Sequence, residues 1–67
     1  MHFRIYQDEQ RRFRWRLLSD TNETVAHSAD AYGTRNDCVR AIALIRYDVG
    51  QADVFDWSVD PVQLIRV

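Results

Sequence analysis

Residues 13–17 of the chain read FRWRL, in which large apolar residues alternate with arginine. Because successive side chains of a β-strand point to opposite faces, a strand over residues 12–18 places Phe13, Trp15 and Leu17 on one face and both arginines on the other. Such a strand is typical of an antiparallel sheet that is covered on one side only. The stretch therefore predicts a strand whose aromatic face packs against another layer.

Two neighbouring stretches extend this strand to a three-stranded antiparallel meander. Residues 2–7 alternate in the same way, and residues 23–28, ETVAHS, form a weaker third strand. The connections at residues 8–11 and 19–22 are short and polar, as in antiparallel hairpins. Within the second connection, Asn22 is of a residue type that adopts the left-handed backbone conformation.

One helix is expected after the meander. Thr34 has the side chain of a helix N-cap, and Asp37 favours the positive helix end. The helix is expected to reach about Asp48, and Gly50 is a natural stop. At 100° per residue, the apolar stripe that contains Cys38 faces the sheet. A second contact is indicated by another apolar stripe, which comprises Val39, Ala43 and Tyr47.

The last part of the chain predicts a fourth strand and a tail. Residues 53–59, DVFDWSV, are rich in residues that favour strands, and Pro61 ends the strand because proline cannot continue a ladder. The layout β-β-β-α-β is an α+β fold, with an antiparallel sheet and one helix packed on it. We expect one domain over residues 1–59 and a C-terminal tail over residues 60–67, which can form a short edge strand.

The size of the chain favours a homodimer. A domain of 67 residues buries too little apolar surface to be more than marginally stable alone. Its single cysteine cannot form an internal disulfide and suits a reducing cytoplasm. No zinc-ligand set or cofactor motif is present, and no apolar run is long enough to cross a membrane. We therefore expect association with a second copy to supply the missing stability.

The charge pattern leaves a second interpretation open. Five arginines and two acids give residues 1–18 a charge of +3, whereas residues 19–67 carry −4 from four arginines and eight acids. An Arg-rich sheet face could bind an anion or a nucleic acid. The pI of about 6.0 disfavours nucleic acid, because the chain as a whole is not basic. The residues assigned to this candidate face are Arg4, Tyr6, Arg14, Arg16 and Arg35.

No constellation for catalysis is found in the sequence. The acids are scattered over turns and helix ends, and no nucleophile, zinc-protease or phosphate-loop motif occurs. Cys38 falls in the first helical turn, where a thiol can be activated, but also on the stripe that faces the sheet. We therefore expect Cys38 in the core and a protein that is not an enzyme.

Several of these stretches together resemble a known family. The matching residues are Phe3, Ile5, Tyr6 and Asp8 in the first strand, Phe13 to Leu17 in the second, Thr24, Val25, Ala26 and Ser28 in the third, Tyr32, Thr34 and Arg35 at the helix start, and Ile42 and Ile45 within the helix. Over about residues 3–46 the chain resembles the YegP-like family of small bacterial and archaeal proteins of uncharacterised function. It departs from the family pattern where Arg11 replaces a glycine in the first turn.

The resemblance implies how such a unit is completed. In the family, a β(3)-α-β unit is used twice, as a tandem repeat or as a dimer, and the two units form one sheet with exchanged C-terminal strands. For this chain the resemblance implies a homodimer in which the strand over residues 53–59 is inserted beside the partner. We expect this dimer to act as an interaction or accessory module, which can also bind a further protein partner. The residues expected in the core or at the dimer contact are Trp15, Tyr47, Val54, Phe55 and Trp57.

Overall fold

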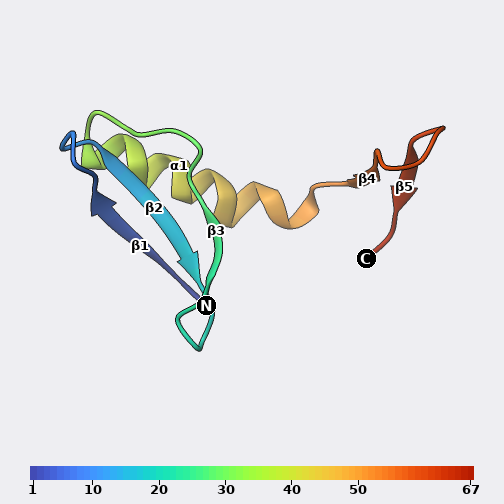
Figure 1. Ribbon diagram of the computed structural model, residues 1–67, viewed down its shortest axis with the longest axis horizontal. Helices are drawn as coiled ribbons and strands as arrows, with labels where there is room; N and C mark the ends of the chain where they lie inside the picture. Colours follow the sequence, from blue (N-terminus) through green and yellow to red (C-terminus); the bar gives the residue numbers. More distant parts are fainter.

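The structure, a computed structural model, describes all 67 residues and has an α+β fold, as predicted. Three antiparallel strands form a sheet in the order β1-β2-β3, and one helix packs on it (Figure 1). The elements in chain order are β1 (His2–Gln7), β2 (Phe13–Leu18), β3 (Thr24–His27), α1 (Arg35–Asp48), the short 3₁₀ helix η1 (Val49–Gln51), β4 (Val54–Asp56) and β5 (Gln63–Ile65).

The two turns of the meander depend on polar side chains and on left-handed backbone. The Asp8 carboxylate accepts hydrogen bonds from the backbone N–H groups of Gln10 and Arg12 at 2.9 and 3.0 Å. Arg11 and Asn22 have positive φ angles of 60° and 63°. This conformation is common for asparagine but unfavourable for arginine. Arg11 therefore occupies a backbone position that glycine would fill without strain.

The helix begins where the sequence predicts. Thr34 is the N-cap, and its hydroxyl oxygen accepts a hydrogen bond from the backbone N–H of Asp37 at 3.1 Å. Helix α1 contacts β1 and β2 and makes no contact with β3. The helix is therefore displaced toward the β1 side of the sheet, and its C-terminal half leads away from the sheet (Figure 1).

The core of the chain is small. Trp15, Leu18 and Cys38 are the only buried apolar residues, and Trp15 meets the ring of Phe3 edge to face at 5.5 Å. The backbone N–H of Trp15 donates to the buried hydroxyl of Ser28 at 3.2 Å. Other inward-facing residues of the sheet are only half-buried, namely Phe3, Ile5, Phe13 and Leu17. The sheet–helix interface is thus incomplete within one chain.

The C-terminal segment forms a separate hairpin. Strands β4 and β5 pair antiparallel with each other and with no other strand. The predicted strand over residues 53–59 is shorter, because the Asp56 carboxylate accepts hydrogen bonds from the backbone N–H (2.8 Å) and hydroxyl of Ser58 and turns the chain. The predicted tail contains β5. We call residues 52–67 the arm and residues 1–51 the body.

The arm projects away from the body (Figure 1). Neither β4 nor β5 contacts any helix or strand of the body. The molecule is 42 Å long, and its radius of gyration is 14.7 Å. A compact domain of this length has a radius of gyration of about 11 Å. The chain is therefore too extended to be a closed globule.

Candidate functional site

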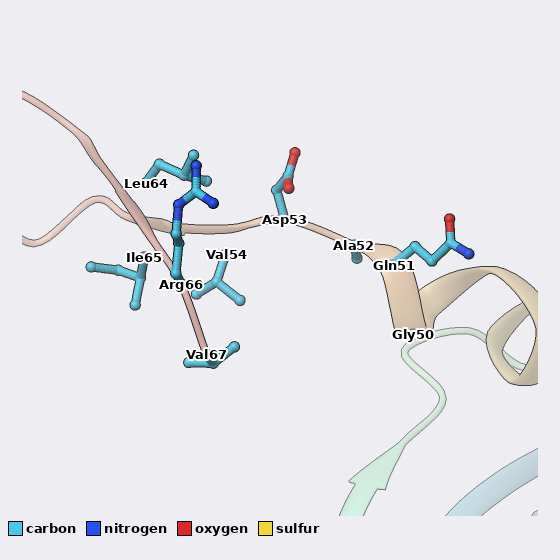
Figure 2. A pocket seen from close by; sticks show the side chains of 9 residues that line it. All are labelled: Gly50, Gln51, Ala52, Asp53, Val54, Leu64, Ile65, Arg66 and Val67. Atoms are coloured by element: carbon cyan, nitrogen blue, oxygen red, sulfur yellow. The ribbon is translucent and has the colours of Figure 1, made fainter.

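The arm exposes large apolar side chains on both of its faces. In the hairpin register, Val54 is opposite Ile65 on one face, and Phe55 is opposite Leu64 on the other. Phe55 is 55% exposed and Trp57 is 80% exposed. The hollow at the base of the arm is lined by residues 50–54 and 64–67, so neither the sheet nor helix α1 covers it (Figure 2). A strand that is apolar on both faces is typical of the interior of a sheet.

A hairpin of this kind is not stable by itself. An isolated two-stranded hairpin is marginal in water, and contiguous exposed apolar side chains mark an interaction surface. Of the five residues expected in the core or at a dimer contact, the single chain buries only Trp15. The other four are exposed in the chain, namely Tyr47, Val54, Phe55 and Trp57. The structure thus brings three of the five together in the arm.

A second apolar surface lies between the first strand and the helix. We call it the β1 groove; its lining residues are Met1, His2, Phe3, Leu17, Ile42, Ile45, Arg46, Val49 and Gly50. Strand β1 is at the edge of the sheet, so the backbone N–H and C=O groups along its outer side have no strand partner. The groove therefore combines a free sheet edge with an apolar floor.

One buried polar atom of the chain has no partner. The indole Nε1 of Trp15 is buried and makes no hydrogen bond. Trp15 is directly opposite Ile5 of β1 in the sheet register. Buried N–H groups are rarely left without an acceptor, because the lost hydrogen bond with water costs about 1–3 kcal/mol. The inner face of the sheet therefore lacks an acceptor as well as apolar cover.

The other face of the sheet is open and basic. In the register of β1 and β2, Arg4 is opposite Arg16 and Tyr6 is opposite Arg14, and His27 of β3 is opposite Arg16. These five residues line two hollows that share Tyr6 and Arg16. Helix α1 packs on the inner face, which carries Trp15, so it does not cover them.

The three arginines of this face differ in their partners. The Arg14 Nε donates to the Asp8 carboxylate at 2.9 Å, which lowers the pKa of Asp8 and raises that of Arg14. The guanidinium of Arg16 lies over the ring of Tyr6, 4.9 Å from its centroid. Arg4 donates to the ring Nε2 of His2 at 3.0 Å. Only Arg14 is paired with a carboxylate.

The structure separates Arg35 from the other three arginines of the predicted basic face, although Arg35 and Tyr6 line one hollow. Arg35 is the first residue of α1 and borders a hollow with Phe3, Ile5 and Phe13, whose side chains face the helix. In its place, Thr24 and His27 border the open face, and sequence reasoning missed both. The alternation of ETVAHS indicated them only weakly, because the β2–β3 register shifts after Leu17.

Other chemical groups of the chain lie apart from these surfaces. The Cys38 thiol is fully buried, and burial raises its pKa. The pKa of Asp56 is lowered by its hydrogen bonds from Ser58. No three His, Cys, Asp or Glu side chains gather where they could hold a metal ion. None of the helices has the length and apolar character that crossing a membrane requires.

Comparison with known proteins agrees with the fold. Two UPF0339 proteins of Neisseria meningitidis, one of serogroup B and one of serogroup A, are each 33% identical over 46 residues, which are 69% of this chain and 80% of the relative. The solution structure of a protein from Haloferax volcanii has a TM-score of 0.76 and 27% identity, and the match covers 82% of this chain and 92% of that one.

A family assignment follows from a third comparison. Residues 8–56 match the family described as Domain of unknown function (DUF1508). The match begins in the first turn of the meander and ends with β4, so it includes most of the body and the first strand of the arm. This agrees with the resemblance to the YegP-like proteins, and the chain belongs to the DUF1508 family, whose function is unknown.

Proposed function

We propose that the protein acts as a homodimeric interaction module in which the arm of each copy packs in the β1 groove of the other copy. The observation that carries this proposal is an apolar hairpin that contacts no helix or strand of the body of its own chain. An exposed apolar arm and an open apolar groove in one molecule are complementary surfaces. Their mutual burial would remove both from water.

The chemistry of the two surfaces supports this arrangement. Strand β4 can pair with the free edge of β1 and so satisfy backbone groups that have no strand partner. Phe55 and Leu64 form one apolar face of the hairpin. In the proposed dimer this face packs against Ile42 and Ile45, which line the groove. Each Phe or Leu side chain that becomes buried contributes about 1.5–3 kcal/mol.

Symmetry doubles the effect of the contact. If the arm of one copy fills the groove of a second copy, a two-fold axis makes the reverse contact identical. Two arms and two grooves are then buried together, and no apolar arm is left to bind a third copy. The proposed function is association rather than catalysis, in the reducing cytoplasm that the single cysteine favours.

Light scattering in solution tests this proposal. We expect the full chain to have a mass near 16 kDa, twice the 8.0 kDa of one copy. The double variant Phe55→Asp/Trp57→Asp should have the mass of a monomer, because each substitution places a charge in the proposed contact. Val25→Asp is the matched control, because Val25 is 52% exposed on β3 and outside both surfaces. A folded full-length chain of 8 kDa at 100 µM would refute the proposal.

A further inference from the structure

The open face of the sheet has a feature that homodimerisation leaves unexplained. Arg4, Arg16 and His27 are directly opposite one another on β1, β2 and β3. We call these three residues the basic row. We propose that this face binds a segment of single-stranded nucleic acid, with Arg4 and Arg16 contacting its phosphates and a base stacking on Arg16. All residues of the site come from one chain, so the proposal does not rest on arm exchange.

The basic row is unfavourable without a ligand. Like charges directly opposite one another on an antiparallel pair destabilise it. The chain has ten acidic residues, yet no carboxylate lies within salt-bridge distance of Arg4 or Arg16. Strands in a sheet are about 4.8 Å apart, so the row is about 10 Å long. A ligand with successive anionic groups would neutralise both arginines at once.

The same hairpin contains an arginine with the opposite arrangement. Arg14 is opposite Tyr6, and the Asp8 carboxylate pairs with it at 2.9 Å. Arg14 therefore holds the first turn in place and is not free for a ligand. On the open face, Arg4 and Arg16 are therefore the two arginines without a carboxylate partner.

Planar groups favour a nucleic acid over an acidic peptide as the ligand. The guanidinium of Arg16 lies over the Tyr6 ring at 4.9 Å, and the Arg16 side chain is exposed. Unstacked bases of single strands stack on aromatic rings and on guanidinium planes. Thr24 borders both hollows beside Arg16 and offers a hydroxyl to a base edge or a phosphate. An acidic peptide would use the charges of the row but not this stack.

The site is also shaped for a single strand. Its residues lie on the face of a sheet that carries no helix, and its hollows are lined by strand and turn residues. Sheet faces that carry aromatic and arginine side chains recognise splayed bases in known single-strand binders. Only two unpaired arginines take part, so the expected affinity is modest and depends on salt.

Fluorescence anisotropy tests the proposal. A labelled 12-nucleotide single-stranded RNA and a DNA of the same sequence are titrated with the full chain at 25 and 150 mM NaCl. We expect the logarithm of the association constant to fall linearly with the logarithm of the salt concentration. The expected slope is about −1.4, because each of the two phosphate contacts contributes about −0.7. No binding at 25 mM salt with 200 µM protein would overturn the proposal.

Matched variants separate the site from general electrostatic attraction. Arg4→Gln and Arg16→Gln should each weaken binding at least fivefold, whereas Arg40→Gln on α1 should leave it unchanged. Arg16→Lys keeps the charge and loses the guanidinium plane, so it should retain the salt slope and still bind more weakly. Equal losses for Arg40→Gln and Arg16→Gln would overturn the site. Displacement of the oligonucleotide by polyglutamate of equal charge as effectively as by unlabelled oligonucleotide would overturn the nucleic acid as ligand.

Discussion

The body and the arm of this protein are built from similarly apolar sequence but have opposite surroundings. In the body, Trp15 lies under the helix and is 7% exposed; in the arm, Trp57 is 80% exposed. The difference is not one of residue type, because both are tryptophans within strand-like stretches. It shows that the arm has the composition of a core element but no core within its own chain. We propose that the missing contact comes from another molecule.

Removal of the arm is expected to have the largest effect on the stability of the protein. Truncation after Gln51, the last residue of the body, would leave three buried apolar side chains and an uncovered groove. Four large apolar arm side chains at about 2 kcal/mol each give about 8 kcal/mol. A chain of this size has a total stability of roughly 3–10 kcal/mol. We predict loss of cooperative unfolding, measured by circular dichroism during heating; a cooperative transition in the truncated chain would contradict the prediction.

Two adjacent positions of helix α1 test whether the β1 groove takes part in the dimer contact. Ile45 lines the β1 groove, whereas Leu44 is 62% exposed on another side of α1. We predict that Ile45→Asp weakens the dimer by about 3 kcal/mol, or roughly a hundredfold in dissociation constant, because a charge enters an apolar contact. Sedimentation equilibrium measures this constant.

The matched control for the groove is Leu44→Asp. Both substitutions place aspartate in the same helix, so the change in helix propensity is shared. Leu44→Asp should change the dissociation constant less than threefold. If the two variants dissociate equally, the arm does not occupy the β1 groove.

A substitution in the first turn should change the free energy of unfolding by a smaller amount, and it affects only the body. Arg11 has a φ of 60°, which costs a non-glycine residue about 1–2 kcal/mol. Arg11→Gly removes this strain but adds freedom to the unfolded chain, so the free energy of unfolding should rise by about 0.5 kcal/mol. Arg12→Gly is the control: φ is not positive there, and its free energy of unfolding should fall. Chemical denaturation checks both, and a decrease for Arg11→Gly would contradict the account of the turn.

The ion pair of the same turn gives the smallest expected effect. Hydrogen bonding to Arg14 lowers the pKa of Asp8 in the folded state below its ordinary value of 3.8. The stabilisation is therefore fully present above that value and is lost as the pH falls toward the folded pKa. Asp8→Asn should flatten the fall in unfolding free energy below about pH 5. Glu9→Gln should keep the slope, since Glu9 makes no ion pair; equal slopes in both variants would refute the role of Asp8.

Local structure was predictable from the sequence where one short-range signal decides it. The alternation around Trp15 predicted β2 and the side on which the helix packs, and Thr34 predicted the N-cap of α1. The α+β class was confirmed by the structure. In each case the periodicity or the cap is encoded within about ten residues, so distant contacts did not have to be known.

The placement of the arm and the composition of the open face were less predictable. Strand propensity identified the region around Phe55 but does not specify which surface a strand packs on. The register shift after Leu17 determines the position of His27, and no pattern in the sequence predicts this shift. Arg35 is at the start of α1, and its position relative to the strand arginines depends on how the helix packs on the sheet. Long-range geometry therefore limits prediction of both surfaces.

The central claim is that the arm packs on a different copy of the chain. An isotope-filtered nuclear Overhauser experiment on a mixture of ¹³C-labelled and unlabelled protein detects only contacts between copies. We predict cross-peaks between ring protons of Phe55 in one copy and methyl protons of Ile42 and Ile45 in the other. Contacts of Phe55 with these methyls that appear only within one copy, or no such contacts at all, would contradict the claim.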